Sequence, residues 1–361
     1  MPELLLIPFL FFLRKKITTI QFKSRHIFFT VLIILVLFCI GSIYDEFPIY
    51  GMLSSSRSWF YLFVCMFAFS TPNQITNNDL MWLSFGSITA WLVDSLMNYQ
   101  KAIAAAATGE QYVTYGVLLA VPILCSSSIK KSKYLLLLIG VAIISVTVVF
   151  AGVRRLLVVL LLSLLVGLLY SLLKKKKNIV PYTVFSLIFG AMVMAALPVI
   201  RDYVYETSPE MYYRVFVRTE NFLETGDSGS AGDQSRQKHL NDFFDNFEQY
   251  TLPRGMVSMK TKQGQTAGEF NDYPIYQLSW IFGWPIAFCL LFIIGLVLVR
   301  NMRKYNKTTD ETSFVSINSI TVMFMLLFLE GTYIEYPYAT PITGLLLGRA
   351  WLNSKTRSLI Q

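Results

Sequence analysis

The chain changes abruptly from polar to apolar at residues 268–299, GEFNDYPIYQLSWIFGWPIAFCLLFIIGLVLV. Glu269, Asn271 and Asp272 stand at its start, and no charged residue follows within the stretch. A helix rises about 1.5 Å per residue, so this apolar run is long enough to cross about 30 Å of hydrocarbon. The stretch predicts a membrane-spanning helix with carboxylates at its entrance.

Composition extends this prediction to the whole chain. Its 361 residues are 54% hydrophobic and only 15% charged, with a mean hydropathy of +0.52. A soluble domain cannot cover so much apolar surface with so few charges. We therefore expect an all-α polytopic membrane protein with about ten transmembrane helices, and residues 1–13 as a candidate eleventh. The predicted spans are 27–43, 57–70, 80–97, 112–126, 134–151, 155–173, 179–200, 274–299, 313–331 and 337–352.

Lysine and arginine fix the predicted orientation. Alternating the ten spans collects 18 basic residues on one side, in the clusters at 14–25, 130–133, 174–177 and 300–307 and in the C-terminal tail. The short connections on the other side hold four. Basic residues favour the cytoplasmic side, so the lysine-rich side is assigned there. The net charge of +9 is thus mainly a topology signal, and lysines divided among short loops make a poor nucleic-acid surface.

The same alternation places residues 201–272 outside as one long loop between the membrane regions 1–200 and 273–361. Its 72 residues carry 8 basic and 12 acidic side chains, far more chain than a connector needs. An amphipathic helix is expected after Ser208-Pro209-Glu210, and a second over 235–250. Polar, glycine-containing breaks are expected at 224–233 and 256–268. The loop is either a lid over a membrane-facing site or a cap that only joins two spans.

Arginines gather at the predicted outer face, against the usual charge bias. Arg154 and Arg155 stand side by side where two long apolar stretches meet. Arginine binds phosphate through parallel hydrogen bonds and does not deprotonate, so a phosphate-bearing lipid is the natural partner, with headgroup anchoring as the alternative. The candidate substrate-binding residues are Arg154, Arg155, Arg201, Arg214, Arg218, Arg236, Arg254 and Tyr273. The candidate acidic residues at the predicted outer face are Asp94, Asp272, Glu330 and Glu335.

The order of these features resembles the O-antigen polymerase and ligase superfamily of bacterial envelopes. The matching residues, over roughly the C-terminal two-thirds of the chain, are Arg154 or Arg155, Arg236, Pro253-Arg254-Gly255, and Asn271-Asp272-Tyr273 with Gln277 and Gly283. The resemblance implies a Wzy-type polymerase of O-antigen or capsule repeat units. Such an enzyme is a glycosyltransferase that moves a growing glycan from undecaprenyl diphosphate to a hydroxyl of the next unit, outside the cytoplasmic membrane.

The resemblance also implies how the chemistry is divided among residues. Arginines would stabilise the leaving diphosphate without a metal or other cofactor, and Asp272, Glu330 or Glu335 would take the acceptor proton. The four cysteines lie inside apolar stretches with no CxxC pair, which supports no zinc site. The implied partners are the lipid-linked oligosaccharide, the membrane, a chain-length regulator and a flippase.

Three alternatives stay open. A ligase of the same superfamily carries histidine before the asparagine, where this chain has Phe270, which cannot exchange a proton. The two histidines of the chain are His26 and His239, so a ligase would require His239 to take the place of the missing histidine. A flippase or transporter of the same lipid-linked units would more often show an internal repeat, and none is visible. A non-catalytic assembly protein is the third alternative.

Overall fold

The computed structural model of the protein describes thirteen helical elements and their immediate surroundings. The described ranges are 24–44, 48–70, 76–97, 110–124, 154–173, 201–206, 209–225, 243–255, 274–305, 311–329 and 340–355, with isolated positions 135, 139, 140, 184, 187, 188, 190, 191, 195, 198, 199, 238 and 241. These residues are almost all helical, and none of them forms a strand. The all-α class predicted from the sequence is confirmed.

The helices divide into two compact units. One consists of Met1–Ile75 together with His239–Gln361, and the other of Thr76–Lys238. The division into 1–200, 201–272 and 273–361 followed the predicted membrane topology and stays a prediction. Each unit is described by itself below.

The first unit joins the two ends of the chain. Its elements are α2 (Ser24–Tyr44), α3 (Pro48–Phe69), the 3-10 turn η2 (Phe247–Tyr250), α13 (Pro274–Phe282), α14 (Trp284–Tyr305), α15 (Glu311–Leu329) and α16 (Thr340–Lys355). Helix α16 packs along α3, and α14 lies against both α15 and α16. The buried core consists of Ile34, Leu37, Trp59, Leu62, Leu278, Trp280, Ile281, Ala287 and Leu291, with Phe243 and Tyr250 from the segment before α13.

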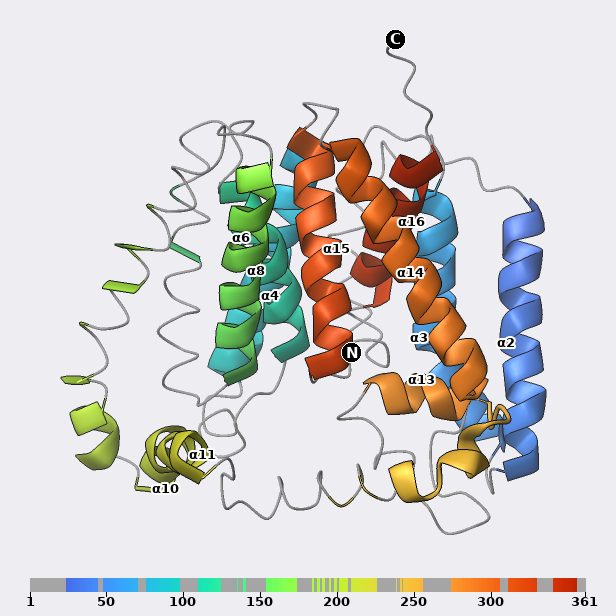
Figure 1. Ribbon diagram of the computed structural model, residues 1–361, viewed down its shortest axis with the longest axis horizontal. Coiled ribbons are helices and arrows are strands. Elements are labelled where there is room, and N and C mark those ends of the chain that lie inside the picture. Colours follow the sequence, from blue (N-terminus) through green and yellow to red (C-terminus); the bar gives the residue numbers. More distant parts are fainter. Residues whose placement is uncertain are drawn as a thin grey trace. The chain divides into compact units, whose positions relative to one another are not determined.

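The span predicted at 274–299 is two helices, so the expectation of one continuous helix was wrong. Helix α13 ends at Phe282, and Gly283 has a φ of +78°, a conformation that glycine adopts readily and other residues avoid. Pro285 then stands in the first turn of α14, where its missing N–H has no helical partner to lose. Figure 1 shows α13 lying across the lower end of α14 instead of extending it.

The second unit contains α4 (Asn77–Met97), α6 (Glu110–Leu124), α8 (Arg154–Leu173), α10 (Pro209–Tyr212), the π-helical turn η1 (Tyr213–Val217) and α11 (Arg218–Thr225). Helix α4 begins with a capping pair, because the Asp79 carboxylate accepts both the backbone N–H and the hydroxyl of Thr76 at 2.7 Å. Helix α6 packs between α4 and α8. The Ser84 hydroxyl donates to the carbonyl of Gly116 at 2.7 Å, where α4 and α6 approach closely.

The two amphipathic helices predicted in the outer loop differ from expectation in detail. The first begins near Pro209 as predicted, but the turn Tyr213–Val217 is π-helical and interrupts the α-helical register. In the second, the backbone is 3-10 helical from Phe247 to Tyr250, and Phe244, predicted on the apolar stripe, is 62% exposed. The predicted breaks at 224–233 and 256–268 lie outside the described residues apart from the end of α11.

One helix in the described part of the chain is long and apolar enough to cross a membrane, Trp284–Arg303 within α14. Phe28–Ile43, Arg57–Phe69 and Val159–Tyr170 are apolar but shorter. A single such helix leaves the polytopic arrangement a prediction.

Candidate functional site

The Pro253-Arg254-Gly255 turn closes the C-terminal end of α13. The backbone N–H of Arg254 donates to the carbonyl of Trp280 at 2.9 Å, and that of Gly255 donates to the carbonyl of Ile281 at 3.1 Å. Carbonyls in the last turn of a helix have no partner within the helix and need one from elsewhere. The Pro253-Arg254-Gly255 motif is therefore bonded through its backbone to the helix that carries Gln277.

Two glycines permit this close approach. Gly255 has a φ of +71°, and a Cβ atom there would collide with the carbonyl oxygen of Leu37 and the backbone nitrogen of Gly41 on α2. A Cβ on Gly283 would lie 2.6 Å from the carbonyl oxygen of Thr251. Both positions exclude a side chain by backbone conformation and by space. The turn is thus wedged between α2 and the end of α13.

Arg254 turns its guanidinium back over the rings beside this junction. Its Cζ lies 4.6 Å from the ring centre of Trp280 and 5.5 Å from that of Tyr250, and Nη2 lies 3.4 Å from Oε1 of Gln249. The residue is 6% exposed. A guanidinium over an aromatic face contributes about 2 kcal/mol when it is shielded from water. It also lies near the negative end of the α13 dipole, which favours a cation.

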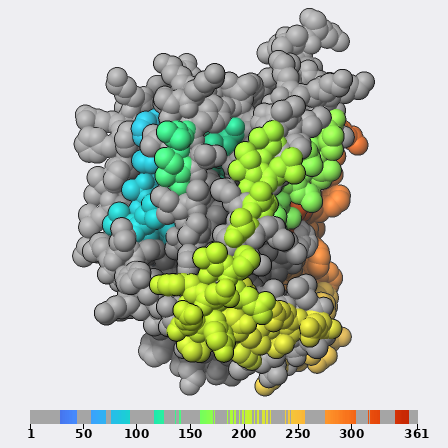
Figure 2. Space-filling view, turned by 90° about the vertical axis from the view of Figure 1, so that its left-hand side faces the viewer, coloured from blue at the N-terminus to red at the C-terminus, as the bar shows by residue number. Residues whose placement is uncertain are grey.

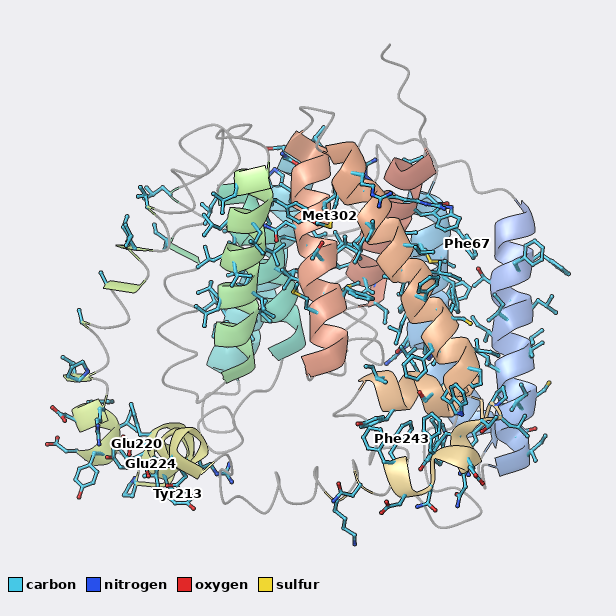
Figure 3. All side chains as sticks on the ribbon, viewed as in Figure 1. Phe67, Tyr213, Glu220, Glu224, Phe243 and Met302 are labelled. Atoms are coloured by element: carbon cyan, nitrogen blue, oxygen red, sulfur yellow. The ribbon has the colours of Figure 1, made fainter. Side chains whose placement is uncertain are left out.

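Aromatic rings surround this guanidinium and hold the segment before it against the bundle. Phe243 lies 4.2 Å from Tyr276 and 4.7 Å from Tyr250 between ring centres, and Phe247 stacks on Trp284 at 4.8 Å. Figure 3 labels Phe243 beside α13. The indole N–H of Trp284 donates to the Thr251 hydroxyl at 3.1 Å. The end of the predicted outer loop that contains Phe243, Phe247 and Thr251 is therefore packed against the helices of the first unit.

Gln277 is the polar residue of this region that the sequence noted without a role. It lies on α13 one turn before Trp280, so the two side chains share a face of the helix. Gln277 is 4% exposed, and neither its Oε1 nor its Nε2 has a hydrogen-bond partner among the residues that the structure describes. Leaving a buried amide unpaired costs about 1–3 kcal/mol.

Arg201 lies in the second unit and is engaged with its neighbours. Its Nη2 donates to the Tyr212 hydroxyl at 3.1 Å and lies 3.4 Å from Oε1 of Glu220. Tyr212, through this hydrogen bond, and then Glu220 raise the pKa of Arg201 above its usual value. Both partners of the ion pair are about half exposed, and Figure 2 shows this stretch in yellow-green on the surface that faces the viewer.

The other arginines on helices are placed by their backbones. Arg154 and Arg155 open α8, Arg214 lies within η1, and Arg218 begins α11. Arg218 is partly buried, and its Nε has no hydrogen-bond partner among the described residues. The side chains of the first three lie outside the described residues, so their expected phosphate contacts stay predictions.

The remaining predicted site residues lie outside the described part of the chain. These are Arg236, Asp272, Tyr273, Glu330 and Glu335, and the side chain of Asp94 is likewise not described. Their attachment points are nevertheless defined. Asp272 and Tyr273 directly precede Pro274, the first residue of α13, and Glu330 follows Leu329, the last of α15.

The structure positions Arg254 relative to α13 but does not describe Asp272. Arg254 is bonded near the C-terminal end of α13, whereas Asp272 precedes its first residues in the sequence. The nine residues of α13 rise about 14 Å from Pro274 to Phe282. The sequence missed the cage of Gln249, Tyr250 and Trp280. Tyr250, four residues before Arg254, was the available signal.

Comparison with known proteins adds no relative to this picture. No protein-family model matches the sequence, and a search of curated proteins finds no significant match.

Proposed function

We propose that this protein polymerises undecaprenyl-diphosphate-linked oligosaccharide repeat units into O-antigen or capsule at the outer face of the bacterial cytoplasmic membrane. The observation that carries the proposal is the junction of the Pro253-Arg254-Gly255 turn with α13. There, the turn bonds to the last turn of α13, the helix that carries Gln277, and lies close to Gly283, so three sequence elements that resemble the polymerase pattern belong to one junction. A junction built around a caged arginine is a suitable base for a diphosphate site.

A membrane setting for this junction is supported by the surfaces of its helices. Helix α14 is apolar over the length of a bilayer, and its outward residues Phe288, Phe292, Ile293 and Leu296 are exposed. Phe28, Phe29, Leu32, Leu35 and Val36 are likewise exposed on α2. Exposed apolar faces of this extent are costly in water and suit a lipid environment. The basic loops place the junction on the extracytoplasmic side under the predicted topology.

The proposed reaction is a glycosyl transfer. The acceptor hydroxyl oxygen forms a bond to the anomeric carbon of the donor glycan as the bond from that carbon to the diphosphate oxygen breaks. The electron pair leaves with the undecaprenyl diphosphate, whose developing charge is stabilised by arginine, with Arg254 as the first candidate. A carboxylate takes the acceptor proton, and Asp272, Glu330 and Glu335 are the candidates.

We propose that residues near the two ends of α13 act on different parts of one extended substrate. Arg254, at the C-terminal end, would hold the diphosphate. Asp272, which comes just before the first residue of α13 in the sequence, would act on glycan beyond the reacting bond or on the incoming acceptor. Glu330 and Glu335 then become the leading candidates for the base, since Glu330 directly follows α15, which contacts α13.

The test is the glycan profile of a deletion strain and of the same strain carrying the gene. A polymerase predicts surface glycan with a single repeat unit in the deletion strain and normal length after complementation. Long polymer still attached to undecaprenyl diphosphate would instead identify a ligase. Absence of repeat units from the outer face would identify a flippase, and an unchanged profile would refute all three.

A further inference from the structure

We propose that Gln277 binds a sugar hydroxyl of the lipid-linked substrate, at a point on α13 between the diphosphate end and the Asp272 end. The inference rests on the proposed function and names a residue to which neither the sequence pattern nor the predicted site gave a role. Its basis is a buried amide with no partner among the described residues.

The energetic argument starts from the amide itself. Gln277 is 4% exposed, and both polar atoms of its side chain lack hydrogen bonds to any described residue. Apolar residues of similar volume would be more favourable at such a position, because they lose no hydrogen bonds with water. An unsatisfied polar group in a well-packed region is typical of a site that is completed by a ligand.

A second amide in the same unit shows what a structural role looks like. Asn301 on α14 is 1% exposed, and its Nδ2 donates to the carbonyls of Val297 at 2.7 Å and Ala350 at 2.8 Å. The second of these bonds ties α14 to α16. Within the described part of the chain, Asn301 therefore has structural partners for its donors but none for its Oδ1, whereas Gln277 has none for its donors or for its acceptor.

The position of Gln277 indicates the ligand class. It shares a helix face with Trp280, whose ring carries the Arg254 guanidinium at 4.6 Å. A group next to a diphosphate in a lipid-linked oligosaccharide is a sugar, which offers neighbouring hydroxyls. A carboxamide donates through Nε2 and accepts through Oε1, so it can bind two such hydroxyls together. An anion would use only the donor.

Access to this side chain requires movement, since it is buried. Helix α13 has nine residues and is separated from α14 by Gly283, whose φ of +78° ends the helical hydrogen bonding between them. A short helix joined through such a residue can shift as a body without unwinding α14. Substrate binding is therefore expected to displace α13.

The test compares Gln277→Met with Asn301→Leu, each in purified protein and in the complemented deletion strain. Gln277→Met should leave the unfolding midpoint unchanged or raise it, and should reduce chain extension roughly tenfold to hundredfold, because buried sugar hydroxyls lose their partners. Asn301→Leu should lower the midpoint, with chain extension per folded molecule near normal. Gln277→Leu serves as a second apolar variant in case methionine packs poorly.

Binding is read with the lipid-linked repeat unit extracted from the deletion strain. This extract should raise the unfolding midpoint of the wild type and raise that of Gln277→Met much less. Normal chain extension by Gln277→Met, or loss of stability in both apolar variants, would overturn the role of Gln277 alone. Normal polymer in the deletion strain would overturn the proposed function, whichever result the variants give.

Discussion

The close contact between α3 and α16 in the first unit yields a quantitative prediction. Gly344 and Gly348 on α16 form a small-xxx-small pair against α3, the spacing that lets membrane helices approach most closely. A Cβ on Gly344 would lie 2.9 Å from the Cys65 Cβ and 3.0 Å from the Met66 nitrogen, and would collide with the carbonyl of Leu62. Most of these atoms belong to the α3 backbone and cannot turn aside.

Gly348 repeats the arrangement one turn further along. A Cβ there would lie 2.9 Å from the carbonyl carbon of Phe69 and 3.0 Å from the nitrogen of Ser70. Ordinary carbon contacts are about 3.5–4.0 Å, so alanine at either glycine requires α16 to move away by roughly 0.5–1 Å. That movement loosens the contacts along the whole α3–α16 interface.

The expected loss of stability follows from two opposing terms. Overpacking costs about 1–3 kcal/mol, and a backbone obstacle favours the upper half of that range. Alanine recovers about 1 kcal/mol through its better helix propensity. Gly344→Ala should therefore destabilise by about 1–2 kcal/mol. Adding Gly348→Ala should cost less than twice as much, because the first substitution already separates the helices.

Gly295→Ala on α14 is the matched control. Its Cβ would meet only the Phe324 ring edge, at 3.8 Å, which is ordinary contact. The better helix propensity of alanine is then the main effect, and the stability of this variant should be unchanged or up to about 1 kcal/mol higher. The measurement is unfolding of the purified protein in detergent by titration with SDS. Equal midpoints for Gly344→Ala and Gly295→Ala would refute the close approach of α3 and α16.

Three further predictions concern the proposed site. Arg254→Lys should lower chain extension roughly tenfold to hundredfold, because lysine lacks the planar guanidinium that binds phosphate and lies over the Trp280 ring. Arg201→Lys should have a smaller effect, because Arg201 is exposed and paired with Glu220. Repeat-unit counts on gels measure both variants, and equal losses would argue against Arg254 as the diphosphate residue. Asp272→Asn keeps helix-capping ability but loses its charge, so folded protein with single-repeat glycan is expected; normal polymer would leave Asp272 a cap only. Cysteine labelling at residue 230 should occur from outside the cell, and labelling only from inside would reverse the topology.

Hydropathy predicted where helices lie but not where they bend. All ten predicted spans contain helical residues among those that the structure describes, and α2, α4, α6, α8, α15 and α16 match theirs within a few residues. The break at Gly283 was missed because apolar content is continuous across it. Its cause is backbone conformation and the packing of Thr251 against the glycine, and only Gly283 and Pro285 hinted at it in the sequence.

The candidate site was predictable in its residues more than in its arrangement. Spacing along the chain brought the Pro253-Arg254-Gly255 turn and Gln277 to notice, but no periodicity indicates that the backbone of Arg254 bonds to Trp280. That contact joins segments separated by a long stretch of chain, and it depends on two glycines with positive φ. Likewise, helical spacing placed Phe244 on the apolar stripe, whereas the 3-10 turn at Phe247 ends that register.

Helix α13 gives the proposed site its geometry, and this changes what its charged residues can do. Arg254 is bonded near the C-terminal end of α13, and Asp272 and Tyr273 precede its first residue, Pro274, in the sequence. The nine residues of α13 rise about 14 Å, so the proposed substrate is expected to extend along the helix. In this arrangement the diphosphate lies at Arg254, a sugar lies beside Gln277, and the glycan extends toward the N-terminal end of α13. Deleting or inserting one residue within α13 would rotate and shift Gln277 relative to Arg254. If the substrate binds along α13, such a variant should lose chain extension even though every proposed binding side chain is kept.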